Sequence, residues 1–335
     1  MFAHAWILIR LDVVLCHFVL TMLTHATLNV IGSNNLVGSL PVDALQVLST
    51  NLELLSVHDN ALSGSISDDL ISSLTLLRSL DVGNNDLTGT ISASFGKLSQ
   101  LSTLRFHRNN LEGSFPAEIG SIYHVLQEIS GYENSLTGSF PWESFLVDSS
   151  EQNAIALSNV NIGSNYITGQ IPSNMTGFSN MRSLVLSKNL LEGELPDLFF
   201  SPLRSLQNLD LSVNRFEDGA TIPTTIGTLT MLRQLRLSWT QLVGSVPTEL
   251  GLLGKLKLLD LNINQLEGTL PSELGNLHEL TQLSIHSNRL TGTVPSEFSS
   301  MSSLRKFQNV DLGGDAVYSF WLEVATCADI FYYFV

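Results

Sequence analysis

The stretch LKLLDLNINQLEGTLP, residues 256–271, decides the fold of this 335-residue chain. Its pattern, L-x-x-L-x-L-x-x-N-x-L-x-G-x-(I/L/V/F)-P, recurs along most of the sequence. The asparagine of the pattern stands at Asn60, Asn85, Asn109, Asn134, Asn165, Asn189, Asn214, Asn264 and Asn288. Thr240 replaces it in one further copy, and Asn34 marks a weaker first copy, with Ala26 and Asn29 where leucines belong. These eleven units are spaced by 24 to 26 residues, except for 31 residues between Asn134 and Asn165.

The repeat predicts a stack of short strands. In the unit quoted above, Leu259 and Leu261 point to one side and Asp260 to the other, because side chains alternate along a strand. Each unit can bury its leucines only against neighbouring units, so the array needs many copies to be stable. Adjacent strands pair in parallel about 4.8 Å apart. We therefore expect a curved parallel sheet with one open face.

The repeated asparagine is expected at the turn that leaves each strand. Its amide group both donates and accepts hydrogen bonds, so stacked asparagines can satisfy turn backbone groups that would otherwise be buried and unpaired. We call the nine asparagines the asparagine ladder. A threonine lacks the second donor, and Thr240 is therefore expected to be a weak position in this ladder.

The second half of the pattern, with glycine and proline at fixed offsets, narrows the assignment. The glycine permits close backbone approach, and the proline favours extended geometry before it, hence a second short strand. Over residues 28–312 the sequence resembles the plant-type leucine-rich-repeat family, which includes the extracellular domains of receptor-like kinases and receptor-like proteins, and polygalacturonase-inhibiting proteins. The resemblance implies a leucine-rich-repeat solenoid, an α/β horseshoe with a concave parallel sheet, short second strands, and 3-10 or helical turns on the convex side.

The two ends of the chain differ from the repeats. Residues 1–26 are strongly apolar and indicate a signal peptide or, alternatively, an uncleaved signal anchor. The repeat domain is expected over residues 27–312. Residues 313–335 are apolar and aperiodic, which suggests a truncated or mis-spliced end. Members of the family usually carry cysteine-bearing caps, whereas this chain has only Cys16 and Cys327.

Composition and motifs argue against several functions. The net charge of −15 and the pI near 4.8 disfavour a nucleic-acid partner, which would require a basic footprint. The sequence has no phosphate-binding glycine motif followed by lysine, no kinase H-R-D or D-F-G, and no G-x-S-x-G. His58, His107 and His286 fall on one predicted column but at least two strand spacings apart, about 10 Å, too far to share a metal ion. No catalysis, cofactor or metal is expected.

The open face of the sheet is the expected place for a partner. The candidate ligand-binding residues form two clusters, namely Arg105, His107 and Arg108 beside Tyr132, and Arg233, Arg236 and Trp239. Interfaces favour aromatic residues and arginine, which is the reason for choosing these clusters. The alternative is that they are ordinary solvated residues, with Trp239 covering the gap left by the missing asparagine.

Two further features lie outside the sheet. The unit between Asn134 and Asn165 inserts about six extra residues after Pro141, and such an insertion is either a binding feature or a tolerated loop. Asn174 begins the only N-glycosylation sequon, Asn174-Met175-Thr176, which matters if the chain is secreted.

These features favour a non-catalytic recognition module that binds a protein, peptide or glycan on its concave face. The resemblance implies a secreted or cell-surface role in signalling or defence, and residues 1–26 could also attach the chain to a membrane. One alternative is a secreted inhibitor of a cell-wall-degrading hydrolase, although the acidity and the lack of cysteine pairs count against it. Another is an intracellular scaffold repeat protein.

Overall fold

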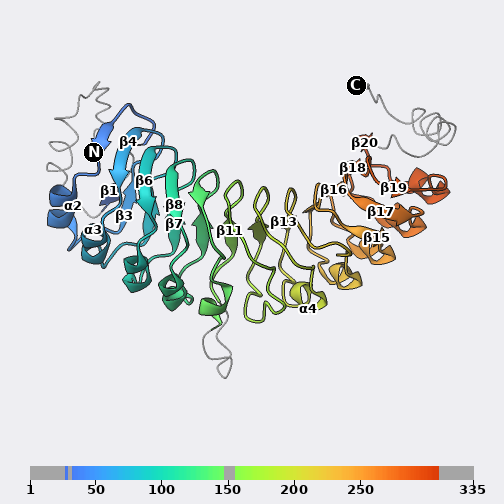
Figure 1. Ribbon diagram of the computed structural model, residues 1–335, viewed down its shortest axis with the longest axis horizontal. Coiled ribbons are helices and arrows are strands. Elements are labelled where there is room, and N and C mark those ends of the chain that lie inside the picture. The colour runs from blue at the N-terminus through green and yellow to red at the C-terminus, as the bar shows by residue number, and fades with distance from the viewer. Residues whose placement is uncertain (1–26, 29–31, 147–154, 309–335) are drawn as a thin grey trace, which may run out of the picture.

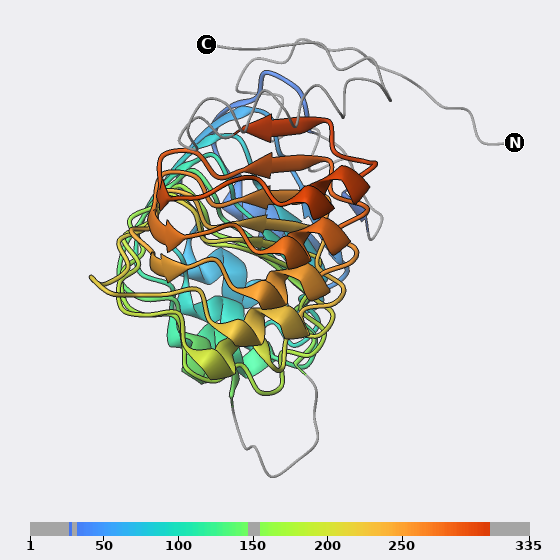
Figure 2. The same cartoon turned by 90° about the vertical axis from the view of Figure 1, so that its right-hand side faces the viewer.

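Successive repeats coil into a curved array. The structure, a computed structural model, describes residues 27–28, 32–146 and 155–308. In Figure 1 the repeats follow one another along an arc, with a sheet on the inner side and short helical turns on the outer side. Figure 2 looks along the stack and shows the strands and the helical turns of successive repeats in separate rows. The predicted leucine-rich-repeat solenoid is confirmed.

The inner side is a twelve-stranded parallel sheet, here called the concave sheet. In spatial order its strands are β1 (Thr27–Leu28), β3 (Leu54–Ser56), β5 (Ser79–Asp81), β7 (Thr103–Arg105), β9 (Glu128–Ser130), β11 (Asn159–Asn161), β12 (Ser183–Val185), β13 (Asn208–Asp210), β14 (Gln234–Arg236), β16 (Leu258–Asp260), β18 (Gln282–Ser284) and β20 (Lys306–Gln308). The middle residues pair in register, as Leu235 does with Leu209 and Leu259. These three leucines are fully buried, as the alternation predicts.

The glycine-containing half of the repeat forms the predicted second strands, in two smaller parallel sheets. The five-stranded sheet contains β2 (Val37–Ser39), β4 (Ala61–Ser65), β6 (Asp86–Thr90), β8 (Asn110–Gly113) and β10 (Ser135–Leu136). The three-stranded sheet contains β15 (Val243–Ser245), β17 (Gln265–Gly268) and β19 (Arg289–Leu290). Gly89 shows why glycine recurs here: its φ is +84°, and a Cβ on it would lie 3.1 Å from the Cβ of Ser65.

The outer side consists of short helices and 3-10 turns. They are α2 (Val42–Leu48), α3 (Asp68–Ser73), η1 (Ala93–Lys97), η2 (Ala117–Ile122), η3 (Trp142–Phe145), α4 (Asp197–Phe200), η4 (Thr224–Thr228), η5 (Thr248–Leu252), η6 (Ser272–Asn276) and η7 (Ser296–Ser300). A proline of the repeat precedes most of them, since its fixed φ suits the start of a helical turn. Ser67 and Ser92 instead cap α3 and η1 through their side chains.

Aromatic side chains replace leucines in the core on both sides of the inserted segment. We call Phe115, Phe140, Trp142, Phe145 and Phe178 the aromatic cluster. Ring centroids lie 4.9 Å apart for Phe115–Phe140, 4.4 Å for Phe140–Trp142 and 6.2 Å for Phe145–Phe178. All five side chains are buried. The part of the insertion at residues 147–154 lies outside the described residues, and the cluster holds the chain just before it.

The first unit departs from the expected alignment. Leu28, and not Asn29, pairs in register with Leu55 of the next unit, whereas the backbone N–H of Asn34 still donates to Asp59. The first unit therefore has one extra residue between its strand and its asparagine. Strand β20 adds a twelfth strand after the eleven predicted units. The predicted segments 1–26 and 313–335 lie outside the described residues.

The asparagine ladder connects each turn to the one before it. In Asn85, Nδ2 donates to the carbonyl oxygens of Val82 and Gly83 in its own unit, at 3.0 and 3.2 Å. The same nitrogen donates to Val57 of the preceding unit at 3.1 Å, and Oδ1 accepts from the N–H of Leu62 at 3.0 Å. Equivalent bonds to a preceding unit recur at Asn109, Asn134, Asn165, Asn189, Asn214, Asn264 and Asn288. Asn60 likewise accepts from Leu36 N–H.

Thr240 occupies its place in the ladder without making the full set of bonds. Its single hydroxyl hydrogen faces two acceptors, the carbonyl of Leu237 at 2.6 Å and Oδ1 of Asn264 at 3.0 Å. In the previous unit, Leu191 N–H donates to Asn214 Oδ1. Within the described residues, the equivalent N–H of Phe216 has no such bond to Thr240. The ladder is interrupted at a residue that is completely buried.

Replacing Thr240 with asparagine is expected to raise the free energy of unfolding by about 1 kcal/mol, the usual net contribution of a hydrogen bond. The new amide would accept from Phe216 N–H and donate to the carbonyl of Leu211, as Asn264 does to the carbonyl of Leu237 in the unit before it. Urea denaturation of wild type and Thr240→Asn measures the difference. Thr240→Val, which removes the hydroxyl at similar volume, should move stability in the opposite direction. A lower stability of Thr240→Asn would contradict the interpretation.

Candidate functional site

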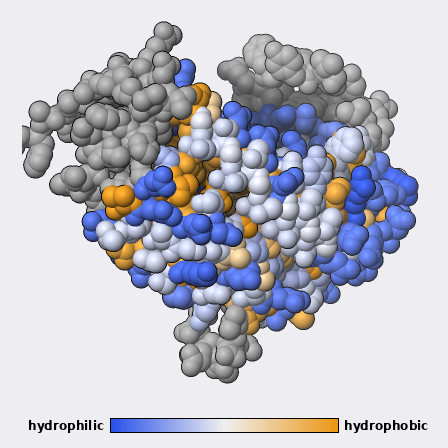
Figure 3. All heavy atoms as spheres, turned by 60° about the vertical axis from the view of Figure 1, so that its left-hand side comes forward, coloured by the Kyte–Doolittle hydropathy of each residue, from blue (hydrophilic) through white to orange (hydrophobic). Residues whose placement is uncertain are grey.

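The concave sheet presents an open, mostly polar surface between two edges. We call the edge where its strands begin the upstream edge, and the edge where they end the downstream edge. Each strand of this sheet from β1 to β18 is followed by a turn whose residue just before the ladder position has a positive φ, for example +54° at Asn84 and +52° at Arg108. Figure 3 shows one side of the molecule, where hydrophilic and intermediate side chains predominate and hydrophobic ones occur in small groups.

The first predicted cluster is assembled by two successive strands, β7 and β9, and the turns that follow them. His107 stacks on Tyr132, with ring centroids 4.7 Å apart and planes 12° from parallel. The guanidinium carbon of Arg108 lies 5.7 Å from the centre of the same tyrosine ring, and Arg108 Nε binds Glu133 at 3.0 Å. Arg105 makes a bidentate pair with Glu128, with both distances 2.8 Å. The structure thus brings these residues together.

The two arginines of this first cluster form ion pairs with neighbouring carboxylates. Arg105 also lies 3.6 Å from Asp81, so two carboxylates flank it, and the pairing with Glu128 raises the pKa of Arg105. Neither Glu128 nor Glu133 was recognised from the sequence, because each lies on the strand or turn after its arginine, about 25 residues away. The cluster presents a stacked aromatic surface with its charges largely compensated.

Burial lowers the pKa of His107 below its usual value, and the nearby charges of Arg108 and Arg105 act in the same direction, whereas Asp81 opposes them. The folded protein therefore favours neutral His107. Its contribution to stability is present above the unfolded pKa near 6.5 and is lost as the pH falls from there toward the lower folded pKa.

We expect wild type to lose more stability between pH 7 and pH 5 than the His107→Gln variant, because the folded state must then protonate a histidine held neutral. Urea denaturation across this pH range measures the difference. His278→Gln, on the outer side, is the matched control. Identical pH profiles for wild type and His107→Gln would show that this histidine is not held neutral by the fold.

The second predicted cluster lies along one strand and its turn. Arg233 is exposed at the upstream edge, Arg236 lies at the centre of the face, and Trp239 is in the downstream turn. Arg236 Nη1 binds Gln234 Oε1 at 2.8 Å, and its neighbours in register are Asp210 and Asp260. The three residues are therefore spread across the sheet. Trp239 is 57% exposed and does not fill the gap at the ladder, which Thr240 itself occupies.

Sequence reasoning missed the residues at the two edges. At the upstream edge, Arg182, Lys257 and Arg305 occupy the position equivalent to Arg233, and all are exposed. At the downstream edge, Val213 and Ile263 occupy the position equivalent to Trp239. Both sets are visible in the sequence once the units are aligned on the ladder position. The basic residues stand seven residues before it, and the apolar residues stand one residue before it.

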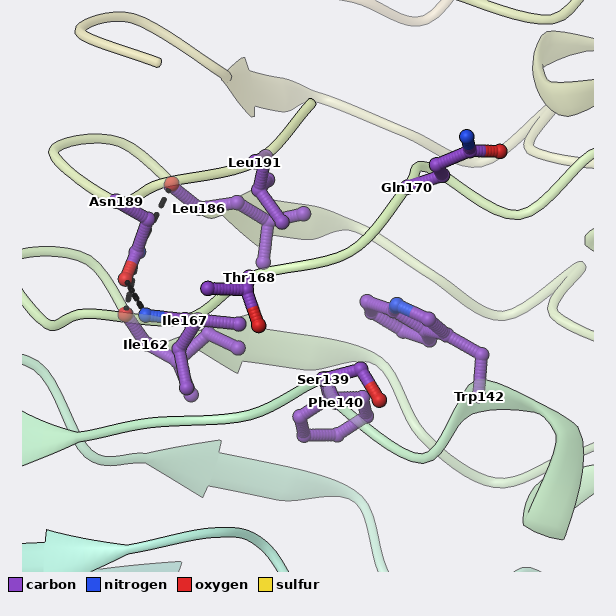
Figure 4. A pocket seen from close by; sticks show the side chains of 10 residues that line it. All are labelled: Ser139, Phe140, Trp142, Ile162, Ile167, Thr168, Gln170, Leu186, Asn189 and Leu191. Atoms are coloured by element: carbon purple, nitrogen blue, oxygen red, sulfur yellow. Dashed lines mark hydrogen bonds between the residues drawn. The ribbon is translucent and has the colours of Figure 1, made fainter. Parts of the chain in front are cut away.

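Neither of two hollows in the described part of the chain has the shape of a deep ligand site. One, shown in Figure 4, lies between the aromatic cluster and the ladder residue Asn189 and has a volume of about 10 Å³, room for one water molecule at most. A second, of about 260 Å³, lies at the upstream edge and is lined by Gln127, Ala156, Ser158, Asn180, Arg182 and Ser205. It is polar and open, and Arg182 is its one charged lining residue.

The sequence matches the Leucine Rich Repeat family at residues 76–98, 255–277 and 279–301. Receptor-like protein 34 of Arabidopsis thaliana is 34% identical over 226 residues, which are 60% of this chain and 21% of that protein. Receptor-like protein 35 of the same plant is 34% identical over 137 residues, 41% of this chain and 14% of that protein. The chain is a plant-type leucine-rich-repeat protein. It spans about a fifth or less of the length of these two relatives.

Solved structures extend the likeness over most of this leucine-rich-repeat protein. The Arabidopsis receptor kinase HAESA, in complex with the peptide hormone IDA and the co-receptor SERK1, is 28% identical with a TM-score of 0.65, covering 83% of this chain and 48% of that one. PEPR1 with AtPEP1 is 30% identical with a TM-score of 0.60, covering 87% and 46%. A plant ice-binding protein is 27% identical with a TM-score of 0.57, covering 85% and 80%.

The structure describes the glycosylation sequon, and its helices can be compared with the length that a membrane span requires. Asn174 is exposed between strands β11 and β12, and its Oδ1 accepts from the backbone N–H of Thr176 at 2.8 Å. Across the part of the chain that the structure describes, no helix is long and apolar enough to cross a membrane.

Proposed function

We propose that this leucine-rich-repeat protein is a non-catalytic recognition module that binds a protein or peptide on its concave sheet. The observation that carries the proposal is the open twelve-stranded face with exposed polar and aromatic side chains, among them Trp239. The likeness to HAESA with the peptide hormone IDA, and to PEPR1 with AtPEP1, supports a peptide ligand. An inhibitor of a hydrolase would use the same face. The alternative of an intracellular scaffold is distinguished by the localisation test below.

To test this proposal, peptides that bind the full chain are selected from a displayed library of random dodecapeptides. Their binding is then measured after one face of the protein at a time has been blocked with a bulky label. In a background without Cys16 and Cys327, Ser187→Cys places a bulky maleimide label on the concave face. Ser65→Cys places it on the five-stranded second sheet as the matched control. Labelling at residue 187 should abolish binding of the selected peptides, and labelling at residue 65 should not. Failure to select any peptide, or equal binding after both labels, would overturn the proposal.

We also propose a second candidate function, ice binding, from the exposed face of the five-stranded sheet. Hydroxyl side chains flank the stacked glycines, at Ser63 and Ser65 of β4 and at Thr88 and Thr90 of β6. All four are exposed, and Ser65 pairs in register with Thr88. Strands about 4.8 Å apart thus carry a regular, largely uncharged array of groups that can each donate and accept hydrogen bonds.

The likeness to a plant ice-binding protein over 80% of that chain favours this second candidate. Inhibition of ice recrystallisation by the purified chain tests it. Ser65→Tyr with Thr90→Tyr should abolish the inhibition by disrupting the hydroxyl array, and Thr248→Tyr on the outer turns should leave it unchanged. A chain without effect on ice growth would exclude ice binding without touching the peptide proposal.

A secreted or cell-surface location is proposed on the basis of the receptor-like relatives and the exposed sequon. The alternatives are that residues 1–26 are not cleaved and anchor the chain to a membrane, or that the chain is retained inside the cell. When the chain is expressed in plant cells, a peptide N-glycosidase should increase its gel mobility, and Thr176→Ala should remove that change. An unglycosylated protein in the cytosolic fraction would contradict the proposed location.

A further inference from the structure

Three apolar side chains occupy consecutive turns at the downstream edge. Val213 is 40% exposed, Trp239 is 57% exposed, and Ile263 is half-buried. They are adjacent in space, because Val213 N–H donates to Ser238 and Trp239 N–H donates to Ile263. We call them the apolar ridge. The other residues at this position are Ser33, Asp59, Asn84, Arg108, Glu133, Ser164, Lys188 and Ser287.

The ridge residues are poorly suited to the backbone that they occupy. Their φ values are +55°, +56° and +52°, in the left-handed region that glycine and asparagine tolerate and β-branched residues avoid. Burial does not compensate, since Val213 and Trp239 remain largely exposed. Among the described turns, which all have this positive φ, only these three combine it with a β-branched or aromatic side chain that exposes apolar surface, an arrangement suited to contact with a partner.

The upstream edge of the same strands is strongly basic. The row of equivalent positions reads Arg182, Gln207, Arg233, Lys257, Thr281 and Arg305, linked by backbone hydrogen bonds from each residue to the carbonyl of the one before. We call its four cations the basic strip. Each is exposed.

The basic strip has little carboxylate near it in the sequence. The six segments that lead into these strands, residues 179–184, 204–209, 230–235, 254–259, 278–283 and 302–307, hold seven of the sixteen Lys and Arg residues but only one of the 31 Asp and Glu residues, Glu279. All five ion pairs among the described residues lie in earlier units, up to Glu133. In a chain of net charge −15, these unpaired cations are a local exception.

The two edges face each other across one stretch of concave sheet. Arg233 and Trp239 are six residues apart on either side of β14, hence at most about 20 Å apart. Between them Arg236 is flanked by Asp210 and Asp260, so these three side chains at the centre of the face carry a net charge of only −1. A ligand that contacts both edges must span up to about 20 Å, with charge at one end, apolar surface at the other and little charge between.

From this arrangement we propose that the stretch of concave sheet from β12 to β20 binds a peptide segment with acidic side chains at one end and a large apolar side chain at the other. The basic strip holds the acidic end, and the apolar ridge holds the apolar side chain. A polyanionic glycan would use only the strip, since it has no apolar side chain for Val213 and Ile263. The inference rests on the proposed peptide recognition and specifies its chemistry and its place.

The test compares two double variants of the full chain against peptides selected from a random dodecapeptide library. Arg233→Gln with Lys257→Gln should weaken binding about tenfold at low salt, and less at high salt because exposed charges are screened. Val213→Asn with Ile263→Asn should also weaken binding about tenfold. The same ridge variant should raise Tm by about 2 °C, since asparagine tolerates a positive φ. A merely structural role would not separate affinity from stability in this way.

Matched controls are Arg78→Gln, at the strip position of an earlier unit, and Ser164→Asn, at the ridge position of another. Both should bind like wild type. The selected peptides should share an acidic group and a large apolar residue separated by several positions. Peptides that are blocked by the label at Ser187→Cys but retained by both double variants would overturn this inference and leave peptide recognition standing. Binding of dextran sulfate that depends on the strip alone, with no such peptide selected, would indicate a glycan ligand and overturn it as well.

Discussion

Replacing Asn214 with alanine is expected to lower the free energy of unfolding by about 3 kcal/mol, because several buried backbone groups lose their partners at once. Asn214 is 4% exposed. Its Nδ2 donates to Leu186 at 3.1 Å and Leu211 at 2.8 Å, and its Oδ1 accepts from Leu191 N–H. The next position of the ladder is Thr240, which already fails to support its neighbour. Two successive units would then lack a ladder amide.

Because Asn214 is next to the interrupted position Thr240, the loss of stability in Asn214→Ala can be compared with the loss at a ladder position that has an asparagine on both sides. Asn109→Ala removes an equivalent asparagine whose neighbours on both sides, Asn85 and Asn134, remain. It should cost less than Asn214→Ala, because coupling between units is between nearest neighbours. Denaturant titration measures both costs, and Asn276→Ala, an exposed asparagine on η6, should be neutral. Equal costs for the two buried positions would show that the interruption at Thr240 does not weaken the array.

Replacing Phe178 with alanine is expected to lower the free energy of unfolding by about 4 kcal/mol, the typical cost of removing a large buried ring. Phe178 is fully buried, and its ring lies 5.9 Å from that of Trp142 and 6.2 Å from that of Phe145. These contacts join the chain before the inserted segment to the unit after it. The cavity therefore opens where the repeat spacing is longest.

Hydrogen exchange measured on the Phe178→Ala variant should locate the damage. Amides of β9, β11 and β12 should lose protection more than those of β18, because each unit is supported mainly by its neighbours. Leu198→Ala, at an apolar residue that is 66% exposed, is the control and should change stability little. Uniform loss of protection along the whole array would show that the aromatic cluster is not a local support.

The expected surface could be predicted only in part, as Arg105 and Trp239 illustrate. The period placed both on the open face correctly, because a column is defined by counting from the ladder asparagine. Whether a cation is available depends on its neighbours in the adjacent units. Arg105 meets Glu128 and Asp81, whereas the basic strip, which includes Arg233, has no ion pair within the described residues.

The sequence by itself determined the repeat and therefore the architecture. Apolar residues at the inward positions, an asparagine at most turns and a glycine in the second half of the unit are local requirements, so they can be recognised within one unit of about 24 residues. Even the faulty position at Thr240 was visible, because a threonine has one donor hydrogen where asparagine has two. Stacking follows from the pattern, since no unit can bury its leucines alone.

Only the tertiary structure decided which side chains meet. The stack converts a separation of about 24 residues into neighbouring strands about 4.8 Å apart, so small shifts in register choose the contacts. The extra residue in the first unit, the pairing of Arg105 with Glu128 and the alignment of Val213, Trp239 and Ile263 all arise in this way. The repeat specifies the scaffold, and the contacts between its units create the surface that a partner can recognise.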